Sequence, residues 1–78
     1  MDMKLEFIFL QLSNDIDSTM RMHYLTLDIP QHISINLKQP IQDILDEILQ
    51  QLADTGEEEK YRELWNYYSY PIINIREI

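Results

Sequence analysis

The strongest constraint on the fold is an apolar stripe with helical spacing in the middle of the chain. Its residues recur at intervals of three and four, so they share one side of a helix turning about 100° per residue. They are Ile41, Ile44, Leu45, Ile48, Leu49 and Leu52. Pro40 suits the first helical turn, and the only glycine, Gly56, follows the predicted end near Asp54. The rest of the chain must supply an apolar layer for this stripe.

Strand-like segments lie on both sides of this helix in the sequence. Residues 3–12 are apolar on both alternating sides, which predicts a central strand covered on both faces. A turn-rich stretch at 13–18 and an alternating run at 19–29 complete an antiparallel hairpin. Apolar and polar residues alternate again at 33–37, which predicts a short third strand. The β-branched tail 72–78 predicts a final strand.

A second, shorter helix is predicted after Gly56. Thr55 and Glu58 have the spacing of a capping box, and Pro71 marks where the segment must have ended. We interpret the stripe within it as core-facing: Tyr61, Leu64, Trp65 and Tyr68. The sequence therefore predicts a single domain, residues 1–78, of the α+β class. Its small antiparallel or mixed sheet has three or four strands and two helices packed on one face, in the order ββ(β)ααβ.

Part of this pattern has a known parallel. The strand Thr26–Ile29 followed by the helix Pro40–Ile48 resembles the strand-then-helix half of ubiquitin-like β-grasp domains, over about half of the chain. The predicted strand at 33–37 and the second helix depart from that pattern. The ending Arg76–Ile78 also lacks the double glycine used for conjugation. The resemblance is therefore to an architecture, and no family is assigned.

Acidic residues are concentrated on the two predicted helices. Eight of the fourteen lie between Asp43 and Glu63, where only Lys60 and Arg62 oppose them, so this stretch carries −6 of the formal charge of −8. They are Asp43, Asp46, Glu47, Asp54, Glu57, Glu58, Glu59 and Glu63. Binding to nucleic acid or to an anionic membrane begins with Lys and Arg meeting phosphates, so this charge argues against both as direct partners.

The acidic residues allow two interpretations. They can be the solvated back of an amphipathic helix together with residues matched to a helix dipole. They can instead form a binding surface for a basic protein. Asp43 and Glu47 would be about 6 Å apart along the axis, a spacing comparable with the phosphates of a nucleic-acid strand. A nucleic-acid mimic that blocks a basic groove has such a row of carboxylates. We also predict Tyr67 and Tyr70, which lie off the aromatic stripe, as interface anchors beside Glu63.

No sequence motif indicates a catalytic, metal-binding or cofactor-binding site. Asn14, Asp15 and Asp17 offer oxygen atoms, but the glycine and bidentate glutamate of a calcium loop do not follow in register. We expect His23 to be structural and partly buried and His32 to be solvated. We therefore predict no catalytic residue, no metal site and no cofactor. The lack of cysteine excludes disulfides and fits a cytoplasmic protein. The uncharged apolar stretches are too short to cross a bilayer.

These observations lead to one functional hypothesis and one alternative. The first is a small non-enzymatic module of inhibitor or immunity type, of the kind common on phages and mobile elements. It presents a carboxylate-rich helix to a basic protein, with nucleic-acid-binding proteins among the candidate partners. The alternative is a β-grasp-like structural or adaptor domain that acts through a sheet edge or by forming a homodimer.

Overall fold

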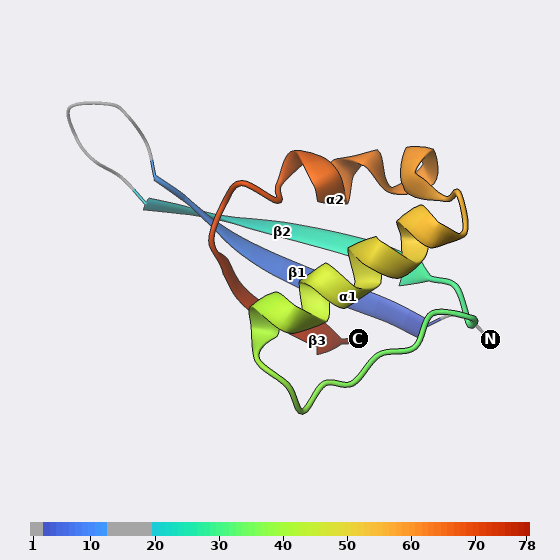
Figure 1. Cartoon of the computed structure of the whole chain (residues 1–78). Helices are drawn as coiled ribbons and strands as arrows, with labels where there is room; N and C mark the ends of the chain where they lie inside the picture. Colours follow the sequence, from blue (N-terminus) through green and yellow to red (C-terminus); the bar gives the residue numbers. More distant parts are fainter. Residues whose placement is uncertain (1–2, 13–19) are drawn as a thin grey trace.

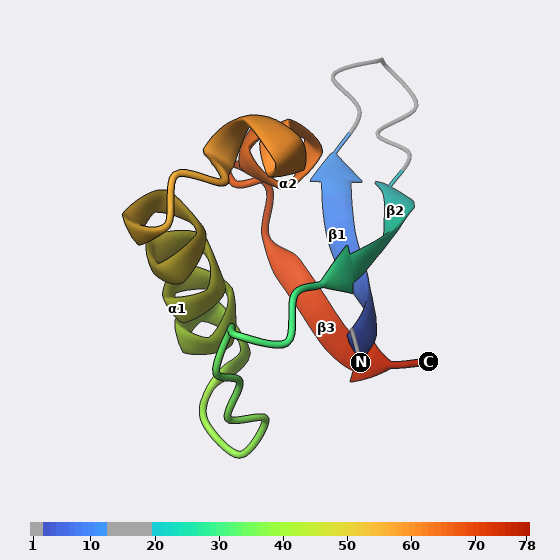
Figure 2. The ribbon, with the colours of Figure 1, turned by 90° about the vertical axis from the view of Figure 1, so that its right-hand side faces the viewer.

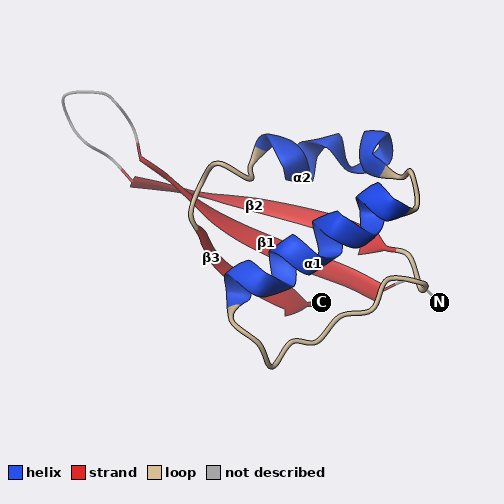
Figure 3. Cartoon of the chain, in the orientation of Figure 1, coloured by secondary structure: helices blue, strands red, loops and turns tan. Residues whose placement is uncertain are grey.

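The computed structural model describes residues 3–12 and 20–78, which form a sheet of three strands and two helical segments (Figures 1 and 3). The elements in chain order are β1 (Met3–Leu12), β2 (Met20–Ile29), α1 (Ile41–Asp54), the 3-10 helix η1 (Glu58–Tyr61), α2 (Arg62–Asn66) and β3 (Ile72–Glu77). The sheet order is β2-β1-β3, and both pairings are antiparallel. The predicted α+β class is confirmed, with helices packed on one face of the sheet.

The central strand supplies the floor of the core. Leu5, Phe7 and Phe9 alternate along β1 on the side that faces the helices, and all three are fully buried. Phe7 pairs with Leu25 on β2 and with Ile75 on β3, so the apolar side chains of the three strands continue across the sheet. The register between β1 and β3 shifts once, next to Phe9.

The predicted stripe packs α1 onto this floor. Five of its six residues are buried and Ile41 is half-buried, because helical spacing turns all of them toward the sheet. The helix ends in a Schellman motif: the Glu57 N–H donates to the Leu52 carbonyl at 2.8 Å and the Gly56 N–H to the Ala53 carbonyl at 3.1 Å. Gly56 has φ +72°, a left-handed conformation that glycine adopts without strain.

The segment predicted as a third strand is a loop. Ile33 is buried and Ile35 half-buried, so the alternation reflects side chains that turn inward from an irregular chain. The backbone of Ser34 is bonded to one side chain: its N–H donates to Gln51 Oε1 and its carbonyl accepts from Gln51 Nε2, each at 2.8 Å. The amide of Gln51 thus replaces the ladder partner that a strand would need.

The second helix is shorter and less regular than the stripe predicts. A 3-10 turn precedes the five-residue α2, and the Tyr61 hydroxyl at their junction donates to the Asp28 carbonyl at 2.8 Å. The capping box is not formed. The Thr55 hydroxyl bonds instead to the Gln51 and Leu52 carbonyls and to the Glu57 carboxylate.

The prediction that β1 is covered on both faces is wrong for the part of the chain that the structure describes. Figure 2 shows α1 and α2 on one side of the sheet and no described element on the other. Ile8 and Leu10 of β1 face that uncovered side and are half-buried there. Next to them on β2 lie Met20, Met22 and Tyr24, which pair across the strands with Leu12, Leu10 and Ile8. We call this surface the open sheet face.

Candidate functional site

The outward side of α1 carries four exposed carboxylates, which we call the acidic face: Asp43, Asp46, Glu47 and Asp54. Asp43, Glu47 and Asp54 lie within about 40° of one another around the helix, opposite the buried stripe, and Asp46 lies on the flank toward α2. The buried isoleucines and leucines of α1 pack against the sheet and fix this orientation. The predicted outward-facing row of carboxylates therefore follows from the packing of α1.

Amide side chains position three of these four carboxylates. Gln39 donates to Glu47 at 2.8 Å, Gln42 to Asp46 at 3.1 Å and Gln50 to Asp54 at 3.0 Å. A neutral amide satisfies a lone pair and leaves the negative charge in place. Among residues 3–12 and 20–78, no Lys, Arg or His side chain forms an ion pair with a carboxylate of α1. The field of the acidic face is therefore not compensated from within the described chain.

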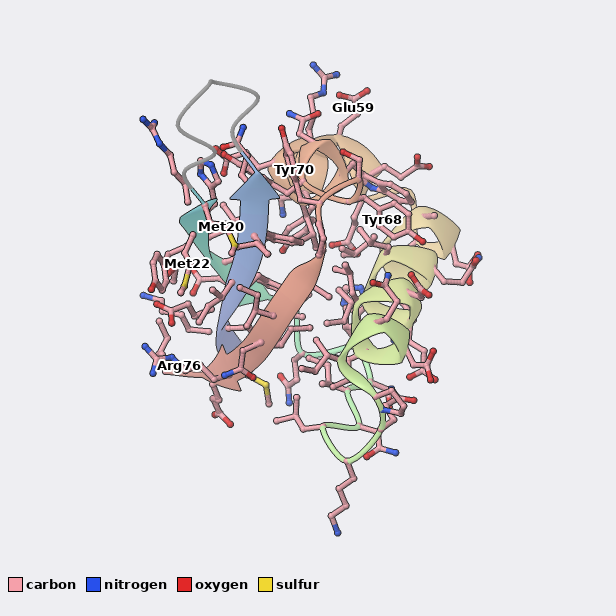
Figure 4. The ribbon with its side chains drawn as sticks, turned by 90° about the vertical axis from the view of Figure 1, so that its left-hand side faces the viewer. Met20, Met22, Glu59, Tyr68, Tyr70 and Arg76 are labelled. Atoms are coloured by element: carbon pink, nitrogen blue, oxygen red, sulfur yellow. The ribbon has the colours of Figure 1, made fainter. Side chains whose placement is uncertain are left out.

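The predicted acidic residues beyond α1 have more varied surroundings. Glu59 pairs with Arg62, with 2.6 Å between carboxylate and guanidinium, and Glu57 pairs with His32 at the same distance. Figure 4 shows the Glu59 side chain projecting outward from the helical segment, away from the sheet. A hydrogen bond from Thr55, helped by the charge of His32, lowers the pKa of Glu57 despite a contrary effect of burial. Glu58 and Glu63 are exposed beside them.

A groove lies between α1 and α2 at one edge of the acidic face. It has a volume of about 300 Å³ and is lined by Asp46, Leu49, Gln50, Ala53, Trp65 and Tyr68. We call it the inter-helix groove. The Tyr68 hydroxyl donates to Asp46 Oδ1 at 2.9 Å, and this bond raises the pKa of the tyrosine. The rings of Trp65 and Tyr68 are 6.1 Å apart at 45°, so two aromatic walls stand beside one carboxylate.

The structure exchanges the expected roles of the aromatic residues. Trp65 and Tyr68, predicted as core, are 38% and 44% exposed. Tyr67 and Tyr70, predicted as anchors, are half-buried and stack in a cluster around His23. Within α2 the buried residue is Leu64 and Trp65 stays exposed. Tyr68 follows the end of α2 at Asn66, so the helical phase of the predicted stripe no longer sets its position.

The cluster around His23 has no carboxylate among its described contacts. His23 is half-buried, as expected, and its ring is hydrogen-bonded to the side-chain amide of Gln11. Tyr67 stacks on Phe9 at 5.5 Å and joins this imidazole to the core. The described contacts of this imidazole are therefore one side-chain amide and two tyrosine rings.

The described chain shows little else that could carry chemistry. No cluster of three or more His, Asp or Glu side chains within residues 3–12 and 20–78 could hold a metal ion. The predicted turn with Asn14, Asp15 and Asp17 lies outside these residues. None of the described helices is long and apolar enough to span a membrane. No protein-family model matches the chain, and no curated protein or solved structure matches it either.

The open sheet face is a second candidate surface. Met20, Met22 and Tyr24 are 64%, 57% and 61% exposed, and Figure 4 shows both methionines projecting from β2 on the side away from the helices. Toward the other end of the sheet this face becomes charged, with the Arg76 guanidinium on Glu6 at 2.6 Å. Contiguous exposed apolar side chains of this kind mark interaction surfaces in many proteins.

Proposed function

We propose that this protein is a non-enzymatic binding module of inhibitor or immunity type, whose acidic face occupies a basic surface of a protein partner. One observation carries the proposal. The four carboxylates of α1 are exposed, three of them (Asp46, Glu47 and Asp54) are held in position by amide side chains, and no basic side chain of the described residues pairs with any of the four. Such charges steer a positively charged partner and reject anionic surfaces.

The spacing of the carboxylates along α1 suggests a class of partner. The side chains of Asp43 and Glu47 follow each other about 6 Å apart along the axis of α1, and Asp54 extends the row by about 10 Å more. The first spacing is of the same order as the axial rise between phosphates on one nucleic-acid strand, about 3.4 Å for a charge that also winds around the axis. We infer that the basic surface belongs to a protein that itself binds nucleic acid and that the acidic face competes for its groove.

A pair of matched variants tests the proposal. Asp43→Asn with Glu47→Gln removes two charges from the acidic face, and Asp28→Asn with Glu77→Gln removes two exposed charges from the sheet. Each form is immobilised and used to capture proteins from a lysate of the cells that encode it. Bound proteins are then quantified by mass spectrometry. A basic protein retained by the wild type and the sheet variant, but lost from the helix variant, is the expected result.

The same experiment can contradict the proposal. If the helix variant retains the partner as well as the wild type does, the acidic face is only a solvated surface. Loss of the partner from both variants would mean that net charge matters and that its position does not. Circular dichroism of each variant establishes that the fold is intact before capture.

The open sheet face supports a second candidate function, a homodimer or adaptor that pairs through this surface. The exposure of Met20, Met22 and Tyr24 favours it, because burying apolar area contributes roughly 25 cal/mol per Å². The mass of the protein in solution, measured by light scattering, distinguishes it. A dimer that Tyr24→Lys converts to a monomer supports this candidate, and a wild-type monomer at all concentrations excludes the homodimer.

A further inference from the structure

We propose that the inter-helix groove is a subsite for one cationic side chain of the partner, and that it prefers the guanidinium of arginine. This deepens the proposed function and rests on it, because the groove adjoins the acidic face and would hold the anchor residue of the same basic surface. The groove combines a carboxylate with two exposed aromatic rings, Trp65 and Tyr68. The carboxylate attracts a cation through a charge-assisted hydrogen bond, and the rings attract it through cation–π interaction.

The bonding of Asp46 shows where a donor can be added. Gln42 Nε2 and the Tyr68 hydroxyl both donate to Oδ1, at 3.1 and 2.9 Å. Oδ2 accepts a hydrogen bond from no described residue. The carboxylate is therefore fixed in orientation by two donors, is not paired with a basic side chain of the described residues and offers its second oxygen to a ligand. A preorganised acceptor of this kind reduces the ordering cost of binding.

The walls of the groove explain the preference for arginine. Trp65 and Tyr68 line the groove with ring centroids 6.1 Å apart at 45°, and the two residues are 38% and 44% exposed. A guanidinium can stack on an aromatic face while its N–H groups donate to a carboxylate, whereas the compact lysine ammonium is more strongly hydrated. Leu49 and Ala53 provide an apolar floor for the methylene stem of the ligand.

The chain's own arginine in this region does not occupy the groove. Arg62 lies in a smaller hollow of about 180 Å³ that it lines with Glu58, Glu59 and Trp65. Its guanidinium is paired with Glu59 at 2.6 Å. Trp65 lines both hollows, so Arg62 and the proposed ligand would lie in different hollows beside the same indole.

The single tryptophan of the chain makes the proposal directly measurable. The probes are acetyl-Gly-Arg-Gly-amide, its citrulline analogue, which is nearly the same shape but neutral, and its lysine analogue. Binding is followed by the NMR resonance of the Trp65 indole N–H. We expect the arginine peptide to shift this resonance to saturation, the lysine peptide to bind more weakly and the citrulline peptide to leave it unchanged.

Two variants with equal changes in charge locate the effect. Asp46→Asn keeps an oxygen for Tyr68 and loses the charge of the groove, and we expect it to weaken the arginine peptide by about fivefold. Asp43→Asn removes a charge from the same helix outside the groove and should weaken it by less than about twofold. Tyr68→Phe, which leaves Asp46 charged, should retain most of the affinity.

Other results would overturn the subsite. They are equal weakening by Asp46→Asn and Asp43→Asn, equal shifts with arginine and citrulline, or no shift of the indole resonance at all. None of these results contradicts the proposed function, which the capture experiment tests separately. A partner could depend on Asp43 and Glu47 and still place no side chain in the groove. Conversely, a saturable arginine site with no partner dependent on the acidic face would support the subsite chemistry and contradict the function.

Discussion

The packing of α1 on the sheet can be tested by truncating one buried side chain. Leu52 is fully buried in the last turn of α1, and Leu52→Ala removes apolar atoms whose space the surrounding core can refill only in part. Such changes cost about 2–5 kcal/mol of unfolding free energy, and we expect about 3 kcal/mol here. A chain of 78 residues has a stability on the order of 4–12 kcal/mol. The variant should therefore lose a large share of its stability.

Urea denaturation measures this loss. The matched control is Leu37→Ala, which truncates the same side chain where it is 45% exposed in the loop before α1, and it should cost less than about 0.5 kcal/mol. Both variants should keep the wild-type dependence of the unfolding free energy on urea concentration, because the surface exposed on unfolding is nearly the same. Equal losses in the two variants would refute the idea that the apolar stripe docks α1 and orients its carboxylates.

Three further predictions concern single groups. Gly56→Ala should destabilise by about 1 kcal/mol in thermal unfolding, because φ is +72° there. Glu57 has a lowered pKa in the folded protein, so its contribution to stability should be complete above the unfolded pKa of 4.5 and should disappear as pH falls through the lower folded pKa. Thr55→Ala should reduce this pH dependence of stability in acid titrations followed by circular dichroism. Tyr68 has a raised pKa, so it should ionise above pH 10, and Asp46→Asn should lower that midpoint in ultraviolet difference spectra.

The sequence predicted best those features that a periodic pattern determines locally. The stripe from Ile41 to Leu52 defined α1, and the exposure of its carboxylates followed from the same periodicity. The two long strands were equally clear, because each is an apolar-rich run of about ten residues and a turn-rich segment separates them. These features depend on spacing along the chain more than on distant contacts.

Features that depend on distant contacts were not predictable in the same way. A run such as 33–37 alternates whether its backbone joins a sheet or, as here, bonds to the Gln51 side chain. The inter-helix groove depends on how the short α2 segment packs: Leu64 is buried, Trp65 and Tyr68 stay exposed, and Tyr67 beyond the helix end is half-buried. The only sequence signal for the groove was the acidic residue Asp46 at the edge of the apolar stripe, which by itself does not indicate an aromatic neighbour.

The uncovered side of the sheet has a similar explanation. Both faces of β1 are apolar, and the sequence pattern alone predicts that both are buried. The described chain supplies helices for one face, so Ile8 and Leu10 are covered only by their neighbours on the strands. Whether a second copy covers them is decided by the mass measured in solution.

The salt dependence of the complex between this protein and its partner tests the central claim most directly. With a purified partner, Kd is measured over a series of salt concentrations for the wild type, for Asp43→Asn with Glu47→Gln, and for Asp28→Asn with Glu77→Gln. From this claim we expect Kd to rise steeply with salt for the wild type and the sheet variant and less steeply for the helix variant, which should also bind more weakly. A Kd that hardly responds to salt, or that is the same for all three proteins, would contradict it.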